Sequence, residues 1–300
     1  MDVSVVVPTL NARERLSACL DALAAHAPGV EVVVVNGPSA DGTTGMVRDR
    51  DDVDVLVEIS SRNPNVSRNA GIEAATGGVV AFVSSDLRVS ESWLPAIEDG
   101  LADAPVVTGP THRAMAKGTA TETPERVRVR SRDVTFFNGR NVALRDWVLS
   151  DLDGFDEYLE TAGERDAAHR LAGLGHEVRW RRDMSVREEL GADGGAASTG
   201  WGWRYRARTY SLVKNYGLRP SVAFRIAARS VGDAAATARD LLRGSGSPSA
   251  WVGNGGAVLS GIYTGASDGL VARTRDRTAT RNPHGVSARA DRVVTKYDWR

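Results

Sequence analysis

Short apolar runs alternate with helix-like segments through the first third of the chain, and this alternation constrains the fold more than any other feature. The runs VSVVVP, EVVVVN, VDVLVEI and GVVAFV are rich in β-branched residues, which is typical of buried strands. Helical patterns lie between them, over residues 12–27, 41–50 and 64–75. Strands that alternate with helices in this way form right-handed βαβ units. The sequence therefore predicts an α/β fold built on a doubly wound, mostly parallel sheet.

The alternation loosens after Leu94, and the composition changes again near Gly191. Between these points, APVVTGP and DVTFFNGRNVALR are predicted strands of a mixed region, GERDAAHRLAGLG is a predicted helix, and HEVRWRRDMSV is compatible with one more strand pair. GADGGAASTG then indicates a linker or a loop. It is followed by two helical patterns, WRYRARTYSLVKNYG and SVAFRIAARSVGDAAATARDLLRG, and by a glycine-rich tail. We expect one domain over residues 1–190 and a helical C-terminal extension over residues 191–300.

The composition argues against several classes of protein. The net charge of the chain is zero, which disfavours a general nucleic-acid binder, and the single cysteine, Cys19, cannot form an intramolecular disulfide or a cysteine metal site. The chain opens directly on a strand pattern, so we expect no secretory signal. No charge-free window of about 18 apolar residues occurs, so we expect no membrane-spanning helix. These features predict a cytoplasmic protein.

Polar residues follow three of the predicted strands. In an open parallel sheet, ligands bind in the crevice at the carboxyl ends of the strands. That rule selects residues 8–11, 36–41 and 84–86 as candidate binding segments. Asp86 is of particular interest because it ends a buried run, where an unpaired charge is costly unless a partner or a ligand holds it.

Four segments of the chain resemble family 2 glycosyltransferases of the GT-A fold. They are VVVPTLNARERL, VVVVNGPSADGT, SRNAGIEAATGGVVAFVSSD and NVALR…GFDEYLETAGERDAAHRL, which occur in the family's order and spacing within the first 190 or so residues. The resemblance implies a GT-A domain that transfers a sugar from a nucleotide-diphosphate sugar to an acceptor hydroxyl, with inversion at the anomeric carbon. The tail segments YSLVKNYGLRPS and NPHGVSARADRVVTKYDWR are similar to haloarchaeal members that build the lipid-linked glycans of surface glycoproteins. That similarity implies a lipid-linked saccharide as acceptor in protein N-glycosylation or surface glycan assembly.

The resemblance and the strand-end rule together place the nucleotide at the first two strand ends. The candidate residues are Pro8, Thr9, Leu10 and Asn11 after the first strand, and Asn36, Ser39 and Asp41 after the second. Asn36 stands where the family usually has an aspartate, so an amide would take over recognition of the base. The alternatives that need no ligand are a tight turn beginning at Asn36 and a helix N-cap at Asp41.

A third donor segment, SRNAG, contributes Arg68 and Asn69. In the family this segment closes over the donor, and its alternative here is a solvated helix face.

The leaving diphosphate is assigned by resemblance to the segment Ser84, Ser85 and Asp86. Asp86 matches the second acid of the family's Asp-x-Asp signature and would bind Mg²⁺ or Mn²⁺, ions that prefer oxygen ligands. Ser84 replaces the first acid and brings no charge, so we expect ion binding to depend on the donor. The segment around Val186 often has a histidine in the family. If Arg187 occupies that position, its charge can contact the diphosphate directly.

The acceptor proton is assigned by resemblance to the acidic segment AGERDAAHRL. Glu164 matches the general base, and Asp166 matches the second acidic position. The alternative is a pair of first-turn acids that favour the helix dipole. A carboxylate at a helix N-terminus can still accept the proton, because the acceptor hydroxyl becomes acidic as the displacement proceeds.

The extension interleaves arginines with tryptophans and tyrosines in WGWRYRARTYSLVKNYGLRP. Such a pattern suits the interface of a membrane, where aromatic rings lie at head-group depth and arginines meet lipid phosphates. The alternative is that the helices only pack on the catalytic domain.

Two other functions of the protein stay open: an enzyme whose acceptor is polyprenyl phosphate itself, and a non-catalytic subunit that binds nucleotide sugars. A lipid acceptor would place the protein at the inner face of the cell membrane.

Overall fold

A computed structural model of the protein describes residues 1–115, 118–188, 200–242, 248–286 and 292–300. The chain forms two compact units, one of residues 1–194 and 284–300 and the other of residues 195–283. The sequence had suggested a single extension from residue 191 to the end. In the structure, residues 284–300 belong to the first unit instead. Among the described residues, no helix is long and apolar enough to cross a membrane.

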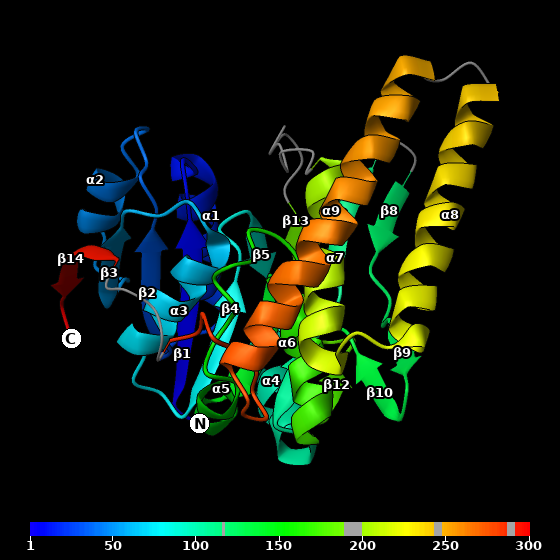
Figure 1. Ribbon diagram of the computed structural model, residues 1–300. Helices are drawn as coiled ribbons and strands as arrows, with labels where there is room; N and C mark the ends of the chain where they lie inside the picture. Colours follow the sequence, from blue (N-terminus) through cyan, green and yellow to red (C-terminus); the bar gives the residue numbers. More distant parts are fainter. Residues whose placement is uncertain (116–117, 189–199, 243–247, 287–291) are drawn as a thin grey trace. The chain divides into compact units, whose positions relative to one another are not determined.

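The first unit is built on an eight-stranded sheet with the strand order β12-β6-β11-β4-β1-β2-β3-β14 (Figure 1). Its strands are β1 (Val3–Thr9), β2 (Glu31–Asn36), β3 (Val55–Ile59), β4 (Val79–Val83), β6 (Val106–Thr108), β11 (Asn141–Arg145), β12 (Val178–Trp180) and β14 (Val293–Asp298). The four predicted N-terminal strands form a parallel centre, while β11 and β14 run antiparallel to their neighbours. The predicted α/β class and mostly parallel sheet are confirmed.

Helices cover both faces of this sheet, as a doubly wound fold requires. They are α1 (Arg13–His26), α2 (Thr43–Arg48), α3 (Pro64–Ala74), α4 (Trp93–Asp103), α5 (Asp146–Leu152) and α6 (Gly163–Leu174). On one face, Leu16 and Leu20 of α1 pack with Val5 and Val7 of β1 in the main core. On the other face, Val6 lies against α3 at Gly71. Each fully buried leucine stabilises the fold by about 2 kcal/mol.

A second, four-stranded sheet has the order β5-β13-β7-β8. Its strands are β5 (Leu87–Val89), β7 (Thr111–Met115), β8 (Gly118–Thr121) and β13 (Val186–Glu188), and a separate hairpin joins β9 (Arg126–Val129) to β10 (Arg132–Thr135). The segment HEVRWRRDMSV does contain two strands, β12 and β13, but they belong to different sheets. Because β5 begins directly after Asp86, this small sheet fixes one side of the candidate site.

The second unit contains three helices, α7 (Trp201–Tyr216), α8 (Pro220–Leu242) and α9 (Pro248–Arg275). The sequence predicted α7 and α8, but the glycine-rich tail that was expected next is largely the long helix α9. Its glycines are the reason that it packs closely. A Cβ at Gly261, Gly265 or Gly269 would lie 2.1, 2.4 or 2.7 Å from a backbone oxygen of α7. Residues four apart share one face of a helix, so these glycines form a continuous contact with α7.

This packing predicts opposite effects for two glycine substitutions in the same helix. Gly265→Ala places a methyl group 2.4 Å from the carbonyl oxygen of Arg206, which should lower the free energy of unfolding by about 1–3 kcal/mol. Gly256→Ala meets open space and should raise it by up to about 1 kcal/mol, because alanine is the better helix former. Chemical denaturation of the full chain measures both values. Equal effects would contradict the glycine contact.

Candidate active site

The three predicted binding segments lie at the same edge of the main sheet. Strands β1 and β2 are parallel neighbours, with Thr9 in register with Asn36. Strand β4 is the parallel neighbour of β1 on its other side, with Phe82 in register with Val6. Segments that follow these strands therefore emerge together. The structure brings residues 8–11, 36–41 and 84–86 to one edge of the sheet, where the strand-end rule places a ligand.

Hydrogen bonds between side chains and backbone hold the first two segments against each other. Ser39 Oγ donates to Asn36 Oδ1 at 2.7 Å, and the backbone N–H of Asn11 donates to Ser39 Oγ at 2.8 Å. The N–H of Ala40 donates to Asn11 Oδ1 at 2.8 Å, and Asn11 itself has a positive φ of 48°. Asn36 Nδ2 also donates to Thr44. These side chains therefore hold the segments after β1 and β2 together.

Thr9 differs from these residues because its hydroxyl is unused. Thr9 Oγ1 is buried and has no hydrogen-bond partner among the residues that the structure describes. Its neighbours, Pro8 at the end of β1 and Leu10, are half-buried, and Leu10 lies against Gly37. Thr9 is therefore the side chain of this segment that is available to donate to a ligand.

Asp41 anchors two helices. Its Oδ2 accepts from the N–H of Arg13 at the start of α1, at 3.0 Å, and its Oδ1 accepts from the N–H and the hydroxyl of Thr43 at the start of α2. Partial burial works to raise the pKa of Asp41, but the hydrogen bonds from Thr43 and Arg13 outweigh it and lower the pKa. The N-cap of α2 is Gly42 and not Asp41, but Asp41 accepts hydrogen bonds at the starts of both helices from the position before that N-cap.

Asp86 has one oxygen paired and one free. Asp86 Oδ2 accepts from Arg140 at 2.5 Å, and its side chain is only 20% exposed. Asp86 Oδ1 is buried and has no hydrogen-bond partner in the described part of the chain. Burial works to raise the pKa of Asp86, but the charge of Arg140 and hydrogen bonds from Ser84 and Arg140 outweigh it, so the pKa lies below its usual value. The carboxylate is an anion at neutral pH and has one oxygen available for a cation.

Arg140 extends this contact into a chain of charges. It lies 3.4 Å from Glu188 in β13, and Glu188 also pairs with Arg113 in β7. Neither Arg140 nor Glu188 was predicted as a site residue. The sequence instead pointed to Arg187, which is exposed, and neighbouring residues of a strand point to opposite faces of its sheet. The basic side chain that contacts Asp86 in the structure is Arg140.

The segment before β11 connects Asp86 with Glu164. Arg140 pairs with Asp86, while a Cβ on the preceding residue, Gly139, would lie 2.9 Å from the Cβ of Glu164 and 3.0 Å from the guanidinium of Arg68. Arg68 Nη2 also donates to the carbonyl of Gly139 at 3.1 Å. Burial lowers the pKa of Arg68, and the nearby charge of Glu164 opposes that shift. The predicted diphosphate residue and the predicted base therefore flank one tight segment.

Arg68 and Asn69 are buried, so the solvated helix face that was considered for them is not observed. Asn69 Nδ2 donates to the carbonyl of Phe155 and to Glu157 Oε1, and Asn69 Oδ1 accepts from the N–H of Phe155. Arg68 Nη1 donates to Asn65 at 2.7 Å. Both the oxygen and the nitrogen of the Asn69 amide are thus hydrogen-bonded to the loop that precedes α6.

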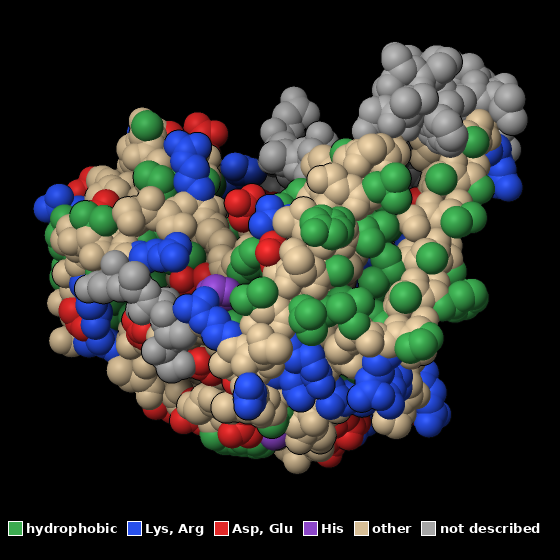
Figure 2. Space-filling model, viewed as in Figure 1, with side chains coloured by type: hydrophobic (Ala, Val, Ile, Leu, Met, Phe, Trp, Pro, Cys, Tyr) green, Lys and Arg blue, Asp and Glu red, His purple; other side chains and the backbone are tan. Residues whose placement is uncertain are grey.

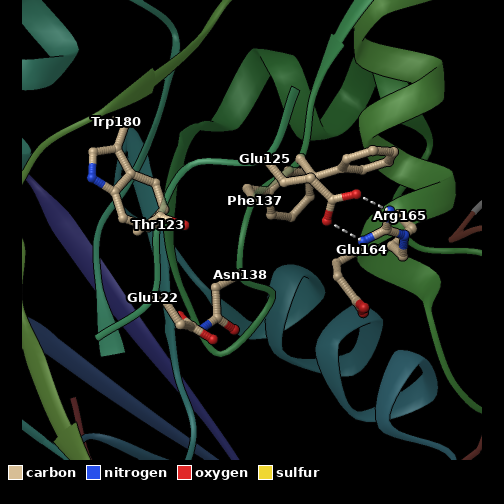
Figure 3. A pocket seen from close by; sticks show the side chains of 9 residues that line it. Glu122, Thr123, Glu125, Phe137, Asn138, Glu164, Arg165 and Trp180 are labelled. Carbon is tan, nitrogen blue, oxygen red and sulfur yellow. Dashed lines mark hydrogen bonds and ion pairs between the residues drawn. The ribbon is translucent and has the colours of Figure 1, made fainter. Parts of the chain in front are cut away.

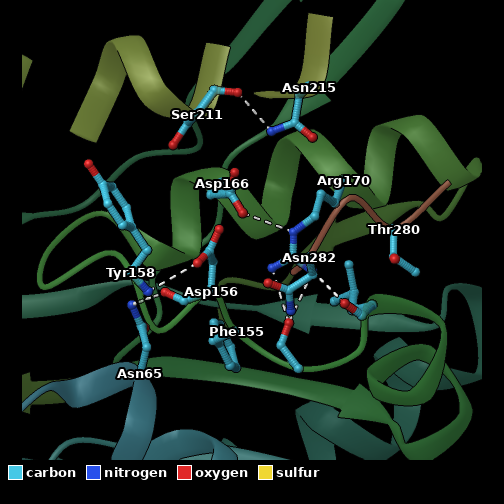
Figure 4. A network of polar contacts seen from close by, with 12 residues as sticks. Asn65, Phe155, Asp156, Tyr158, Asp166, Arg170, Ser211, Asn215, Thr280 and Asn282 are labelled. Atoms are coloured by element: carbon cyan, nitrogen blue, oxygen red, sulfur yellow. Dashed lines mark hydrogen bonds and ion pairs between the residues drawn. The ribbon is translucent and has the colours of Figure 1, made fainter. Parts of the chain in front are cut away.

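Asp166, unlike Glu164, is buried in an ion pair. Its side chain is completely buried and pairs with Arg170 at 2.9 Å, and Arg170 donates to the carbonyls of Leu152 and Gly154 (Figure 4). Asp166 does not line the cavity described below. Breaking a buried ion pair by removing one partner is costly, so Asp166 supports the start of α6 and thereby the placement of Glu164.

Glu164 lines a cavity of about 250 Å³. The other lining residues are Glu122, Thr123, Glu125, Phe136, Phe137, Asn138, Arg165 and Trp180. Figure 3 shows Trp180 and Thr123 on one side and Glu164 and Arg165 on the other. The cavity thus combines aromatic surfaces with carboxylates and an amide, a set that sequence analysis did not identify apart from Glu164.

The single cation in this lining is neutralised. Arg165 donates to both oxygens of Glu125, at 2.9 and 2.8 Å, and its guanidinium stacks on Phe136 at 3.8 Å from the ring centroid. Asn138 Nδ2 donates to Glu122 at 2.7 Å, which orients that carboxylate. The lining holds three carboxylates and one arginine, although Arg68 and Arg113 lie near Glu164 and Glu122 outside it, so the cavity favours neutral or positively charged groups.

The residues around Asp86 fit a divalent ion only in part. No group of three or more His, Cys, Asp or Glu side chains in the described ranges is arranged to hold a metal. The free, buried Oδ1 of Asp86 is one hard oxygen ligand, and Mg²⁺ and Mn²⁺ accept further oxygens from phosphates and water. The site fits an ion that arrives with a diphosphate, whose oxygens complete the coordination.

Comparison with known proteins identifies the family. Residues 4–154, half of the chain, match the family described as "Glycosyl transferase family 2". The chain is 26% identical over 203 residues to the glycosyltransferase AglE of Haloferax volcanii, a match that covers 61% of this chain and 65% of AglE. The match thus spans somewhat less than two thirds of that relative's length.

Solved structures show the same fold. S. aureus TarS 1–349 in complex with UDP-GlcNAc superposes with a TM-score of 0.62 and 18% identity, covering 92% of each chain. The mannosyltransferase PcManGT from Pyrobaculum calidifontis, in complex with GDP-Man and Mn²⁺, superposes with a TM-score of 0.55 and 20% identity, covering 92% of this chain and 88% of PcManGT. The family match establishes that the chain belongs to glycosyl transferase family 2, and the likeness to these structures shows the GT-A fold.

Proposed function

We propose that this protein is an inverting glycosyltransferase that moves a sugar from a nucleotide-diphosphate donor to the terminal sugar of a lipid-linked saccharide. The observation that carries the proposal is the short segment 139–140, which contacts Asp86 at the end of β4 and Glu164 at the cavity. A leaving group at Asp86 and an acceptor at Glu164 would face each other across this segment. The similarity to haloarchaeal family members supports a role in surface glycan assembly.

The donor would lie in the crevice with its diphosphate at Asp86 and Arg140. Thr9 and the backbone of residues 36–41 would contact the nucleotide, with Asn11, Asn36 and Ser39 shaping that segment. Arg140 brings a positive charge within hydrogen-bond distance of Asp86, so it can contact the phosphates as they leave. A Mg²⁺ or Mn²⁺ ion held by Asp86 would neutralise charge on the departing diphosphate.

Glu164 would act as the general base. The acceptor oxygen forms a bond to the anomeric carbon while the bond from that carbon to the phosphate oxygen breaks, and the electron pair leaves with the nucleotide diphosphate. Glu164 takes the proton of the acceptor hydroxyl as that oxygen becomes acidic. A single displacement of this kind inverts the configuration at the anomeric carbon. Asp166 acts through the buried pair with Arg170, which holds the start of α6.

The cavity favours a saccharide over a bare lipid phosphate as the acceptor group. Trp180 and Phe137 offer apolar ring surfaces, and the carboxylates of Glu122 and Glu164 can accept hydrogen bonds from sugar hydroxyls. The three carboxylates of the lining outnumber its one arginine, which is paired with Glu125, so the lining disfavours a phosphate more than a neutral saccharide. This charge pattern is the specific reason to prefer a lipid-linked saccharide to polyprenyl phosphate.

An acceptor comparison tests this proposal. Purified protein is supplied with a radiolabelled nucleotide sugar and either polyprenyl phosphate or a polyprenyl-linked saccharide, and labelled lipid is counted. We expect the saccharide to be glycosylated at least ten times faster, a ratio that corresponds to about 1.4 kcal/mol. Preferred transfer to bare polyprenyl phosphate would overturn the acceptor assignment. Donor binding without transfer to any acceptor would favour a non-catalytic subunit.

A further inference from the structure

The second unit is strongly basic although the whole chain is neutral. Residues 195–283 contain twelve arginines and one lysine but only four aspartates and no glutamate, a net charge of +9. Because the chain as a whole has no net charge, its remaining residues carry −9. Such a difference in charge between parts of a chain indicates that the basic part meets an anionic partner.

An apolar stripe is exposed along α8 of this unit. Phe224 is 74% exposed and Val231 is 69% exposed. Ala228 and Ala235, which are also exposed, continue the same face, because residues three, four and seven apart lie on one side of a helix. The opposite side of α8 is buried at Val222 and Ile226. The outer face of α8 is therefore apolar along its first four turns.

Helix α9 carries a matching stripe. Leu259, Tyr263 and Leu270 are 70%, 78% and 41% exposed, and they lie on the side of α9 away from the glycines that contact α7. Figure 2 shows hydrophobic side chains gathered over both α8 and α9. Single exposed apolar side chains are common on proteins, but repeated ones on two adjacent helices mark an interaction surface.

We propose that the outer face of α8 and α9 docks onto an anionic lipid bilayer. The large side chains Phe224, Val231, Leu259 and Leu270 have no hydrogen-bonding groups and suit insertion among acyl chains at the interface. The basic charge of the unit draws it to lipid phosphates, which supply roughly 1 kcal/mol for each arginine or lysine near the surface. Nucleic acid fits less well, because most of these side chains are aliphatic and cannot stack on bases.

This inference deepens the proposed function, since a lipid-linked acceptor is presented at a bilayer surface. Its evidence, however, is independent of the transfer reaction. Vesicles that contain neither donor nor acceptor test membrane binding alone, so failure of glycosyl transfer and failure of membrane docking are separate results.

Co-sedimentation of the full chain with vesicles tests the docking surface. We expect binding to vesicles of phosphatidylglycerol and phosphatidylcholine, little binding to phosphatidylcholine alone, and a decrease as salt is raised. The double variant Phe224→Ser/Tyr263→Ser should bind the anionic vesicles about tenfold more weakly. Val294→Ser, which replaces a side chain that is 67% exposed in the first unit, should bind like the wild type.

Further measurements separate this result from misfolding and from other partners. The double variant must keep the wild-type melting temperature and nucleotide affinity, and a second variant, Leu259→Ser/Leu270→Ser, repeats the test. Wild-type protein that stays in the supernatant with anionic vesicles, or a double variant that binds them as tightly, would overturn the proposal. Light scattering that shows a dimer lost in the variant, without vesicle binding, would assign the face to a second copy instead.

Discussion

Asp86→Asn is expected to lower the turnover number about a thousandfold, because it removes the negative charge that would hold a divalent ion on the leaving diphosphate. The substitution keeps the shape of the side chain. Arg140 keeps a carboxylate partner in Glu188, at 3.4 Å, so the fold should tolerate the change. Initial rates of nucleotide-diphosphate release with saturating donor and Mn²⁺ measure the effect.

The matched control for Asp86 is Glu91→Gln. Glu91 is an exposed acid a few residues further along the chain, and its replacement should leave the rate unchanged. Titration with Mn²⁺ in the presence of nucleotide diphosphate adds a binding readout, and we expect Asp86→Asn to abolish the dependence on the ion. Wild-type turnover in Asp86→Asn would show that the diphosphate does not lie at this strand end.

Glu164→Gln is expected to lower the turnover number by about two to four powers of ten, the usual loss when a general base is removed. Glutamine has the same size but cannot accept the proton from the acceptor hydroxyl. The KM for the donor should change less than twofold, because Glu164 faces the acceptor cavity. Steady-state kinetics with both substrates varied give these values.

Glu160→Gln provides the control for Glu164, since Glu160 is an exposed acid in the loop before the same helix. Its turnover number should equal that of the wild type. A Glu164→Gln enzyme with normal turnover, or one with a raised donor KM as its main defect, would remove Glu164 from the role of base.

Most of the fold was predictable from local patterns. Strands β1 to β4 are short runs of valine and other apolar residues, a pattern typical of buried strands. Helix α3 begins at a proline, as helices often do. Helix α9 was missed because glycine weakens a helix in isolation, and the contact with α7 that offsets this cost is tertiary. Strand β14 was missed because its pairing with β3 joins distant parts of the chain.

Local patterns predicted the positions of Asp86, directly after β4, and of Glu164, in the first turn of α6, but not the side chains that surround them. Arg140 lies 54 residues from Asp86 and 48 from Glu188, and no local pattern reports such pairing. The only feature of the sequence that could have indicated Arg140 is the polar segment NGR between two apolar runs. The segment around Val186 does pair with β5, which follows Asp86, but Glu188 rather than Arg187 reaches the charge network, because neighbouring residues of β13 point to opposite faces.

Burial distinguishes the predicted residues that could contact a ligand from those that are enclosed by other side chains. Asn69 and Asp166 occur in the right motifs, yet both side chains are completely buried and bound to loop or helix partners. A sequence motif does not distinguish a residue that contacts a ligand from one that holds such a residue in place. Packing decides this, and it is visible only in three dimensions.

Mass spectrometry of the purified protein, incubated with isolated membranes and a panel of nucleotide-diphosphate sugars, tests glycosyl transfer most directly. We predict that one donor yields equal amounts of nucleotide diphosphate and of a lipid-linked saccharide heavier by one sugar, and that Glu164→Gln yields neither. Consumption of no donor in the panel by the wild-type protein, with donor binding intact, would contradict a catalytic role for this chain.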